Sequence, residues 1–327
     1  MRFIFRKLGF YLIAAWVAVT LNFVLPRLIP GNPVDMILAR QAQQGQVPPS
    51  EKQTLEKMLG LSHGSILSQY WDYLSSVAHL RFGLSITYFP TPVSHILRSS
   101  MLWTLGLVGT ATVISAVLGI GLGTVAGWKR GTWLDSLVPA TTFLAAIPYF
   151  WVALLLIYLF TQVWTVFPDQ FSYDPALSIG WSGQFVSSVL RHALLPAITI
   201  VLSSVGGWLL GMRNMMVSTL SEDYVSAAEA KGLRPRTIML GYAARNAVLP
   251  SVAGFAISLG FVISGSLVME MVFSYQGIGY QLLQAVGNND YPLMQAIFLV
   301  ITFAVLAANF LVDVLYGFID PRTRPAR

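Results

Sequence analysis

The sequence predicts an all-α integral membrane protein with six transmembrane helices and both termini in the cytoplasm. Of its 327 residues, 55% are hydrophobic and 10% are charged, whereas soluble domains average roughly 25% charged residues. Lys and Arg gather at the ends of alternate apolar stretches, as topology signals do. Six stretches carry no charge and approach or exceed the roughly 20 residues that a spanning helix needs: residues 9–25, 101–128, 136–168, 193–212, 246–269 and 291–312.

Two of these stretches depart from the ideal length. The first has 17 residues and follows a basic N-terminus, so it also suits a signal peptide. Pro26 and Arg27 follow it without a small-residue cleavage site, which favours a retained helix. The third has 33 residues, more than one span needs and fewer than two spans with a turn need. It predicts one helix over residues 137–161 and an apolar external segment after it.

The distribution of Lys and Arg predicts the orientation. With six helices and a cytoplasmic N-terminus, thirteen basic residues fall on the cytoplasmic side: Arg2, Arg6, Lys7, Lys129, Arg130, Arg213, Lys231, Arg234, Arg236, Arg245, Arg322, Arg324 and Arg327. The short external loops 162–192 and 272–290 contain only Arg191. The other six basic residues lie between Arg27 and Arg98, and a segment of this length is translocated largely regardless of its charge.

The same pattern divides the chain into four parts. They are the cytoplasmic N-terminus with the first helix (1–30), an extracytoplasmic subdomain (31–100), a core of five helices (101–317) and a cytoplasmic tail (318–327). Within the subdomain, residues 41–50 are rich in turn formers. Residues 51–59 and 65–76 space apolar side chains at three and four, which predicts two short amphipathic helices.

Composition and motifs argue against several function classes. The net charge is +6, but the basic residues flank apolar stretches and are not interleaved with aromatics, so no nucleic-acid partner is indicated. The chain has no cysteine, and its four histidines are scattered, so we expect no metal site. A G-x-x-x-x-G-K-[ST] phosphate loop is absent. We expect no catalytic residue and no cofactor bound by this chain, and any nucleotide chemistry would have to come from a partner.

A stripe of small side chains runs down the second stretch, at intervals of four residues: Ala111, Ser115, Gly119, Gly123 and Gly127. Small stripes let helix backbones approach closely in lipid. Two interpretations stay open, plain helix packing and a wall of a translocation path. The candidate path residues are Gly119, Gly123, Ser264 and Glu270.

Glu270 and Asp313 lie at the ends of apolar stretches. An ionisable residue in such a place is a functional candidate by default. Both residues are also close enough to an end to reach the interface or to pair with a neighbouring helix. Anchoring is therefore the alternative to a role in the path.

Gly180-Trp-Ser-Gly183 matches the G-x-S-G pattern of intramembrane serine proteases, and His192 follows it. A catalytic Ser182 would need a buried, water-filled cavity and a histidine base on a neighbouring helix. The motif lies instead in a predicted external loop, and four-residue patterns recur by chance. A serine hydrolase remains the alternative from a different class of protein.

The run SEDYVSAAEAKGL, residues 221–233, predicts a short polar helix between two apolar stretches. Ser221 is a suitable N-cap, Glu222 and Asp223 place negative charge at the positive helix end, and Gly232 suits a left-handed stop. Pro235 then favours the start of another helix. A helix of about ten residues is marginal alone in water, so something should pack on it: either its own membrane domain or a partner.

This run, together with ARNAVLP at 244–250, resembles the cytoplasmic EAA-type signature of permease subunits in binding-protein-dependent ABC importers. The branch it resembles handles dipeptides, oligopeptides, nickel and some oligosaccharides. Further motifs of the branch occur in order along nearly the whole chain: IPGNPV at Ile29, FGLS at Phe82, PVSHIL at Pro92, VFSYQGIG at Val272, NDYP at Asn289 and LVDVLYGFIDPRTR at Leu311. Ser226 stands where the signature has its leading glutamate.

The resemblance implies a bacterial or archaeal cell-membrane permease that forms the path for an oligopeptide or oligosaccharide, with nickel as the alternative. Its partners would be a second, similar permease, two cytoplasmic ATPases that bind ATP and Mg, and an external solute-binding protein. The helix at about 221–232 would be a coupling helix, with a lesser contact through Lys129, Arg130 and Asp135. The implied coupling residues are Glu222, Asp223, Tyr224, Ala227, Ala228, Glu229, Lys231, Gly232 and Arg245.

Overall fold

The computed structural model describes residues 2–28, 65–133, 136–262 and 267–319, and their regular structure is helical apart from one β-bridge between Leu84 and Pro92. Segments marked η are π-helices. The elements are α1 (Arg2–Leu28), α4 (Ile66–Ala78), α5 (Val93–Thr104), η1 (Leu105–Gly109), α6 (Thr110–Trp128), α7 (Leu137–Ala146), α8 (Tyr149–Ile157), η2 (Tyr158–Val163), α9 (Gly183–Thr219), α10 (Asp223–Ala230), α11 (Pro235–Thr237), η3 (Ile238–Ala244), α12 (Arg245–Ala247), α13 (Leu249–Val262), α14 (Leu267–Val272), α15 (Ile278–Gly287) and α16 (Tyr291–Ile319).

Apolar helices dominate this fold. Within the described ranges, four segments are long and apolar enough to cross a membrane: Arg6–Val24, Val93–Trp128, Gly183–Thr219 and Tyr291–Leu311. Two shorter apolar segments, Tyr149–Val163 and Leu249–Gly260, lie in the other two predicted stretches. The prediction of an all-α integral membrane protein is confirmed. The number of six spans stays a prediction, because the two shorter segments are below the length of a full span.

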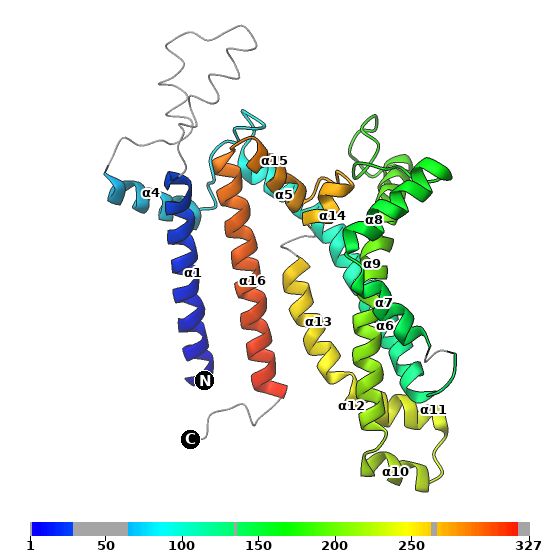
Figure 1. Cartoon of the computed structure of the whole chain (residues 1–327). Helices are drawn as coiled ribbons and strands as arrows, with labels where there is room; N and C mark the ends of the chain where they lie inside the picture. Colours follow the sequence, from blue (N-terminus) through cyan, green and yellow to red (C-terminus); the bar gives the residue numbers. More distant parts are fainter. Residues whose placement is uncertain (1, 29–64, 134–135, 263–266, 320–327) are drawn as a thin grey trace.

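The helices form two neighbouring groups (Figure 1). α1 and α16 lie side by side, and α13 packs against α16. α6 and α9 form a second, extensively packed pair, and α13 also contacts both of them. The start of α1, the end of α16 and all of α10 lie at one end of the molecule, named here the α10 end; α4, α5 and α15 lie at the opposite end, named the α15 end.

The prediction of one helix over residues 137–161, in the third uncharged stretch, is wrong. The helix is interrupted between α7 and α8, at Ile147 and Pro148. Proline has no N–H to donate, and its ring disfavours the helical conformation of the preceding residue. Ile147 is accordingly extended, with φ −78° and ψ 128°. Both halves still contact α9, so the break redirects the chain without detaching it.

The small-residue stripe packs α6 onto α9. A Cβ added to Gly119 would overlap the Cβ of Trp208, and one added to Gly123 would lie 2.5 Å from the carbonyl oxygen of Leu209. The Oγ atoms of Ser115 and Ser204 are 2.8 Å apart across the same contact. On this face the stripe packs the two helices together, because Trp208 and the backbone of Leu209 occupy the space beside Gly119 and Gly123. The assignment of Gly119 and Gly123 to the path stays a prediction.

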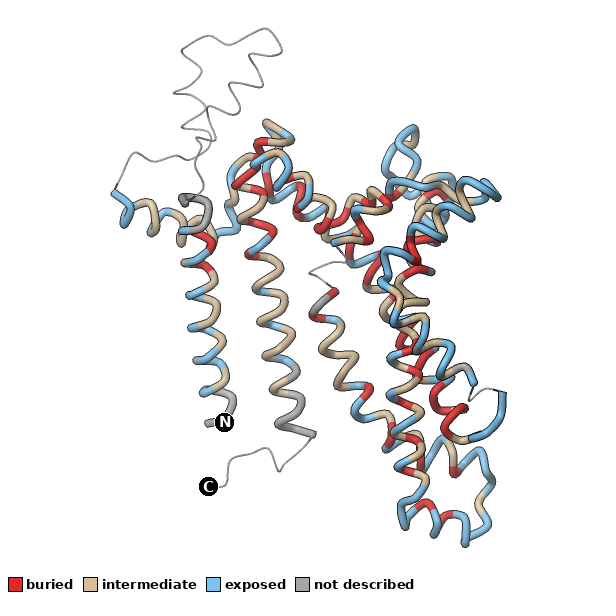
Figure 2. The backbone as a smooth tube through the Cα atoms, in the orientation of Figure 1, coloured by how far each residue is buried: buried red, intermediate tan, exposed pale blue. Residues whose placement is uncertain are grey.

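Burial is concentrated at the α15 end and along the contact between α6 and α9 (Figure 2). α1, by contrast, exposes large apolar side chains: Phe10 is 65% exposed, Ile13 65% and Trp16 59%. A continuous apolar surface of this kind is unfavourable in water, whereas lipid tails solvate it. The exposed face of α1 therefore fits a membrane-spanning segment.

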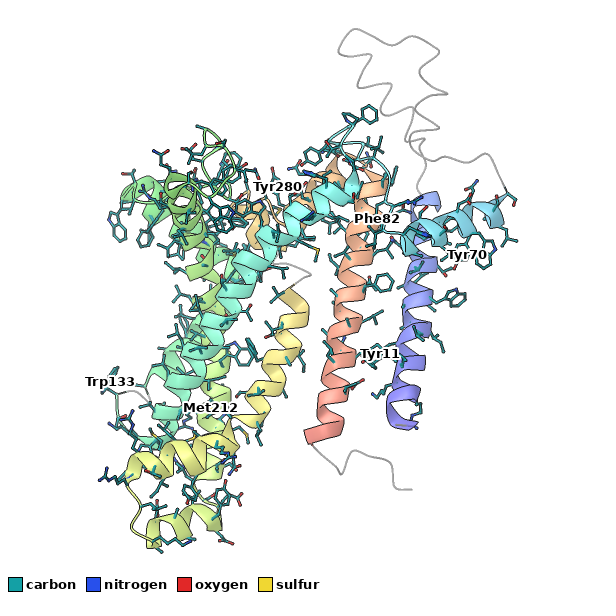
Figure 3. All side chains as sticks on the ribbon, turned by 180° about the vertical axis from the view of Figure 1, so that it is seen from behind. Tyr11, Tyr70, Phe82, Trp133, Met212 and Tyr280 are labelled. Atoms are coloured by element: carbon teal, nitrogen blue, oxygen red, sulfur yellow. The ribbon has the colours of Figure 1, made fainter. Side chains whose placement is uncertain are left out.

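The described part of the predicted extracytoplasmic subdomain is held against α1. α4 confirms the helix predicted over residues 65–76, and its N-cap Ser65 accepts a hydrogen bond from the amide of Ser68 at 3.3 Å. Tyr70, seen beside α1 in Figure 3, places its hydroxyl 2.7 Å from that of Thr20. The second predicted helix, residues 51–59, lies outside the described residues.

Candidate functional site

The short polar helix predicted at residues 221–232 is present as α10, and both its ends are defined by backbone geometry. Gly232 has φ +71° and ends the helix in the left-handed conformation, as predicted. The amide of Gly232 donates to the carbonyl of Glu229 at 2.8 Å, and that of Leu233 to Ala228 at 3.4 Å. This pair of bonds is a Schellman motif, which satisfies carbonyls at a helix C-terminus.

The N-terminus of α10 differs from the prediction by one residue. The N-cap is Glu222, which is extended with φ −79° and ψ 144°. Ser221, the predicted cap, instead donates its hydroxyl to the carbonyl of Ser218 at 2.7 Å. A serine hydroxyl often finds a partner in the preceding turn, and here that bond removes it from the capping position. Asp223 still places a negative charge in the first turn, where the helix dipole favours it.

α10 has a buried face and an exposed face. Val225 and Ala228 are 1% and 2% exposed, and they pack with Ile238 of η3 and with Trp128 at the end of α6. Ala228, one of the predicted coupling residues, therefore packs against its own chain, and its part in coupling stays a prediction. The exposed residues are Glu222, Asp223, Tyr224, Ser226, Ala227, Glu229, Ala230, Lys231 and Gly232. Small Ala227 and Ser226 leave the middle of this surface flat.

The loop between α6 and α7 lies at the same end of the molecule. Arg130 donates to the carbonyl of Val217, on α9, at 2.8 Å. Lys129 is exposed, whereas Asp135 lies outside the described residues. Arg245, the first residue of α12, is also exposed. The α10 end therefore presents exposed basic side chains from three separate segments of the chain.

Glu270 does not line an open surface of the described chain. Its side chain is fully buried, and its carboxylate accepts hydrogen bonds from the Thr104 hydroxyl at 2.7 Å and the Gly279 amide at 2.7 Å. The amide of Tyr280 adds a third, at 3.3 Å. A buried carboxylate with three donors is stabilised by them, so within this chain Glu270 holds α14 to α5 and α15, and its assignment to the path stays a prediction. Ser264, the remaining path candidate, lies outside the described residues.

Asp313 pairs with a neighbouring helix, which is the anchoring alternative. Its Oδ2 accepts from Nζ of Lys7 and from the hydroxyl of Tyr11, both at 2.8 Å. Figure 3 shows Tyr11 between α1 and α16. Because Lys7 and Asp313 are only about one-third exposed, the pair links α1 to α16 at the α10 end more effectively than a fully exposed pair would.

Asp290 is an important polar residue that the sequence reasoning missed. It is fully buried, and its Oδ1 accepts from the amide of Leu293 at 3.2 Å, which caps α16. Its Oδ2 accepts from the hydroxyl of Ser85 and from the amide of Thr87 at 2.8 Å. The motifs NDYP and FGLS therefore meet in space. The local signal was an aspartate before Tyr-Pro, since aspartate favours N-caps and proline the first helical turn.

The serine-hydrolase arrangement is not formed. Ser182 is exposed at the N-cap of α9, where its Oγ accepts from the amide of Phe185 at 3.2 Å. His192 lies ten residues further along the same helix, about 15 Å at 1.5 Å per residue, and its Nδ1 donates to the carbonyl of Ser188 at 2.8 Å. Across the described ranges, no group of three His, Asp or Glu side chains is arranged to hold a metal ion.

These features define a class of protein: a multi-pass helical membrane subunit whose polar residues hold helices together and whose sequence has no phosphate loop. Sequence comparison then gives the family. Residues 119–325 match the model described as binding-protein-dependent transport system inner membrane component. The chain belongs to this family, so it is a transport subunit of the cell membrane and not an enzyme. Membership implies an ATPase and a solute-binding protein as partners.

Individual relatives match over nearly their full length. The di/tripeptide transport system permease protein of Pseudomonas aeruginosa is 33% identical over 99% of both chains. The dipeptide transport system permease protein of Escherichia coli is 30% identical over 99% of both. A probable D,D-dipeptide transport system permease protein of Escherichia coli is 31% identical over 97% of this chain and 95% of its own. Several relatives thus carry names from one branch of transporters.

Proposed function

We propose that this permease spans the membrane six times, with both termini and the α10 end in the cytoplasm. The α10 end carries exposed basic residues from the loop after α6, from α10 with the residues that follow it, and from α12. Cytoplasmic segments of membrane proteins carry such an excess of Lys and Arg. The start of α1 and the end of α16 lie at this same end (Figure 1), in keeping with two cytoplasmic termini.

α10 would act as the coupling helix, docking into a groove of the ATPase. The observation that carries this proposal is its division into two faces. Val225 and Ala228 fix the helix to η3 and α6, while Tyr224, Ala227 and Glu229 remain exposed. A short helix with one face anchored and one face free suits helix-in-groove recognition. Displacement of α10 would be transmitted to α6 through Trp128 and to α9 through the adjoining Leu220. The ATPase would therefore move the membrane helices through α10.

The transported solute would be a short peptide. Three relatives that align over nearly the whole chain are named as dipeptide or tripeptide transport permeases. A second, similar permease would complete the path, and the external solute-binding protein would deliver the peptide at the α15 end. Nickel and oligosaccharides, which the wider branch also handles, serve as competitors in the test below.

The test uses the complete transporter, with its ATPases, second permease and binding protein. ATPase retention is measured on the purified complex, and ATP-driven uptake is measured in vesicles. Ala227→Arg places a long charged side chain on the exposed face of α10, and ATPase retention on the purified complex should fall by at least about tenfold. Ala176→Arg makes the same change at an exposed position in the loop before α9 and should leave retention unchanged.

Solute identity is read in the same vesicles. Uptake of a labelled dipeptide should be abolished by Ala227→Arg and competed by unlabelled dipeptides, but not by an oligosaccharide or by Ni²⁺. Equal ATPase retention by both arginine variants would contradict the role of α10. Competition by the oligosaccharide or by nickel alone would contradict the peptide assignment and leave the docking result standing.

A further inference from the structure

The α15 end contains two separate apolar clusters. The first joins α5, α15 and α16 through Val93, Ile96, Leu97, Ile278, Leu282, Ala285, Leu293, Ala296 and Ile297. The second joins η1, α8, α9 and α14 through Leu107, Ala153, Leu195, Met269, Phe273 and Tyr275. The second cluster shares α9 with the contact to α6, and α9 leads directly to α10. The first cluster includes α16, which pairs with α1.

A buried group of hydrogen bonds, named here the clasp, lies between the two clusters. It consists of the Glu270 carboxylate, the Thr104 hydroxyl and the amides of Ile278, Gly279 and Tyr280. Glu270 directly follows Met269 of the second cluster, and its carboxylate accepts from the amides of Gly279 and Tyr280, directly after Ile278 of the first. Thr104, the last residue of α5, donates its hydroxyl to Glu270 Oε1 at 2.7 Å and accepts from the amide of Ile278 at 2.8 Å. The bonds to Glu270 thus cross between the two clusters, whereas the bond from the Ile278 amide to Thr104 joins α15 to α5 within the first cluster.

The backbone around the clasp is shaped for the carboxylate. A Cβ added to Gly277 would overlap the Glu270 carboxylate, and one added to Gly279 would lie 2.6 Å from Cα of Leu267 and 3.1 Å from Oε2 of Glu270. Figure 3 shows Tyr280 where α15 meets α5. Glycines at both positions let the start of α15 close onto the carboxylate without a side chain between them.

Hydrogen bonds and apolar contacts resist displacement differently. Apolar burial is non-directional, so two packed clusters can shift against each other and stay buried. Hydrogen bonds weaken steeply with distance and angle, and a buried carboxylate that loses its donors is strongly penalised. The clasp therefore fixes α14 and α15 against α5, at the point where the segment Val93–Trp128 continues from the first cluster into the second, in a way that apolar surfaces alone do not.

We propose that Glu270 and Thr104 are positioning residues that make the two clusters move as one body during transport. This inference rests on the proposed function, in which α10 receives the movement of the ATPase. That movement reaches the second cluster through α9. The continuous helical segment Val93–Trp128 carries it to α5, and the clasp ties α14 and α15 to that segment, so the α15 end follows the ATP cycle as a unit.

Double labelling tests the clasp directly, because the chain has no native cysteine. Leu283→Cys on α15 and Leu190→Cys on α9 replace exposed leucines and carry spin labels on either side of the clasp. The labelled full chain should give one narrow distance distribution. Thr104→Val, which removes both hydrogen bonds at nearly constant volume, should at least double its width. Thr112→Val is the matched control, because the Thr112 hydroxyl bonds only to Val108 within the same helical segment.

A functional readout separates positioning from general stability. In the assembled transporter, Thr104→Val should leave basal ATP hydrolysis within about twofold and lower the peptide transported per ATP by roughly tenfold, the effect of losing about 1.4 kcal/mol of coupling. Glu270→Gln keeps one acceptor oxygen, so it should lower the peptide transported per ATP by less than Thr104→Val does. It is the variant to measure if Thr104→Val does not fold.

Two outcomes would overturn the inference. An unchanged distance distribution in Thr104→Val would show that the apolar clusters hold their positions without the clasp. A broadened distribution with unchanged transport per ATP would show that the clasp has no part in coupling. Failure of the unsubstituted chain to retain its ATPases would instead contradict the proposed function, since the label distances do not depend on the partner.

Discussion

At the scale of single residues, polar and small side chains in this permease act mainly by holding helices together. Glu270, Asp290 and Asp313 each accept hydrogen bonds from a distant segment of the chain. Sequence position marked Glu270 and Asp313 as unusual but could not distinguish a path residue from an anchor. That distinction depends on which donors surround the carboxylate, and those donors lie far away in the sequence.

Gly123 provides a sharp test of the packing between α6 and α9. Gly123→Ala should destabilise the chain by about 1–3 kcal/mol, because the added Cβ meets the backbone of Leu209 and a packed interface resists expansion. Gly121→Ala, in the same helix with nothing within 4 Å of the new Cβ, should be neutral or stabilising by up to about 1 kcal/mol. The measurement is the thermal unfolding midpoint in detergent.

Equal shifts of the midpoint in the two variants would contradict this assignment, because the two glycines differ only in the helix face that they occupy. A destabilisation confined to Gly123→Ala would show that the small stripe serves the contact with α9.

At the scale of elements, local signals predicted several helix ends but not every break. Gly232 ends α10 and Pro235 begins α11, as their conformational preferences require. Pro148 interrupts the third stretch, although apolar composition alone favoured one continuous helix. Prolines are tolerated inside other membrane helices, as Pro196 is inside α9. Which proline interrupts a helix therefore depends on the packing around it and not on residue type alone.

The anchored face of α10 leads to a second prediction. Val225→Asp should detach α10 from Ile238 and Trp128, because an aspartate buried there has no partner and its desolvation is costly. Amide hydrogen exchange over residues 223–230 should then accelerate by at least about tenfold, equivalent to about 1.4 kcal/mol of local stability. The readout is local exchange measured by mass spectrometry.

Ser226→Asp is the control, since it introduces the same side chain one residue further on the exposed face. It should leave exchange in α10 within about twofold. Similar acceleration in both variants would show that α10 is not held by its Val225 face.

At the scale of the whole molecule, the arrangement of helices gives the chain two distinct ends. The start of α1, the end of α16 and α10 share one end, and α4, α5 and α15 share the other (Figure 1). Charge distribution predicts the cytoplasmic side, and the fold gathers the exposed basic segments at one end. Both features support the proposed orientation, in which the α10 end is cytoplasmic.

Topology can be tested by single-cysteine labelling in the cysteine-free chain. Ser226→Cys on α10 and Ala176→Cys before α9 both occupy exposed positions. In spheroplasts, a membrane-impermeant maleimide should modify Ala176→Cys and should reach Ser226→Cys only after permeabilisation. Labelling of Ser226→Cys from outside would contradict a cytoplasmic α10 end.

The sequence by itself determined the membrane character of this protein, the polar helix α10 with its end at Gly232, and the family, because hydropathy, helix-end preferences and motif order are local properties. Only the tertiary structure decided that Ala228 faces inward, that Gly119 and Gly123 serve packing, and that Glu270 joins two clusters. Each of these depends on contacts between residues far apart in the chain. Such contacts follow from how whole helices pack, and no local pattern specifies that packing.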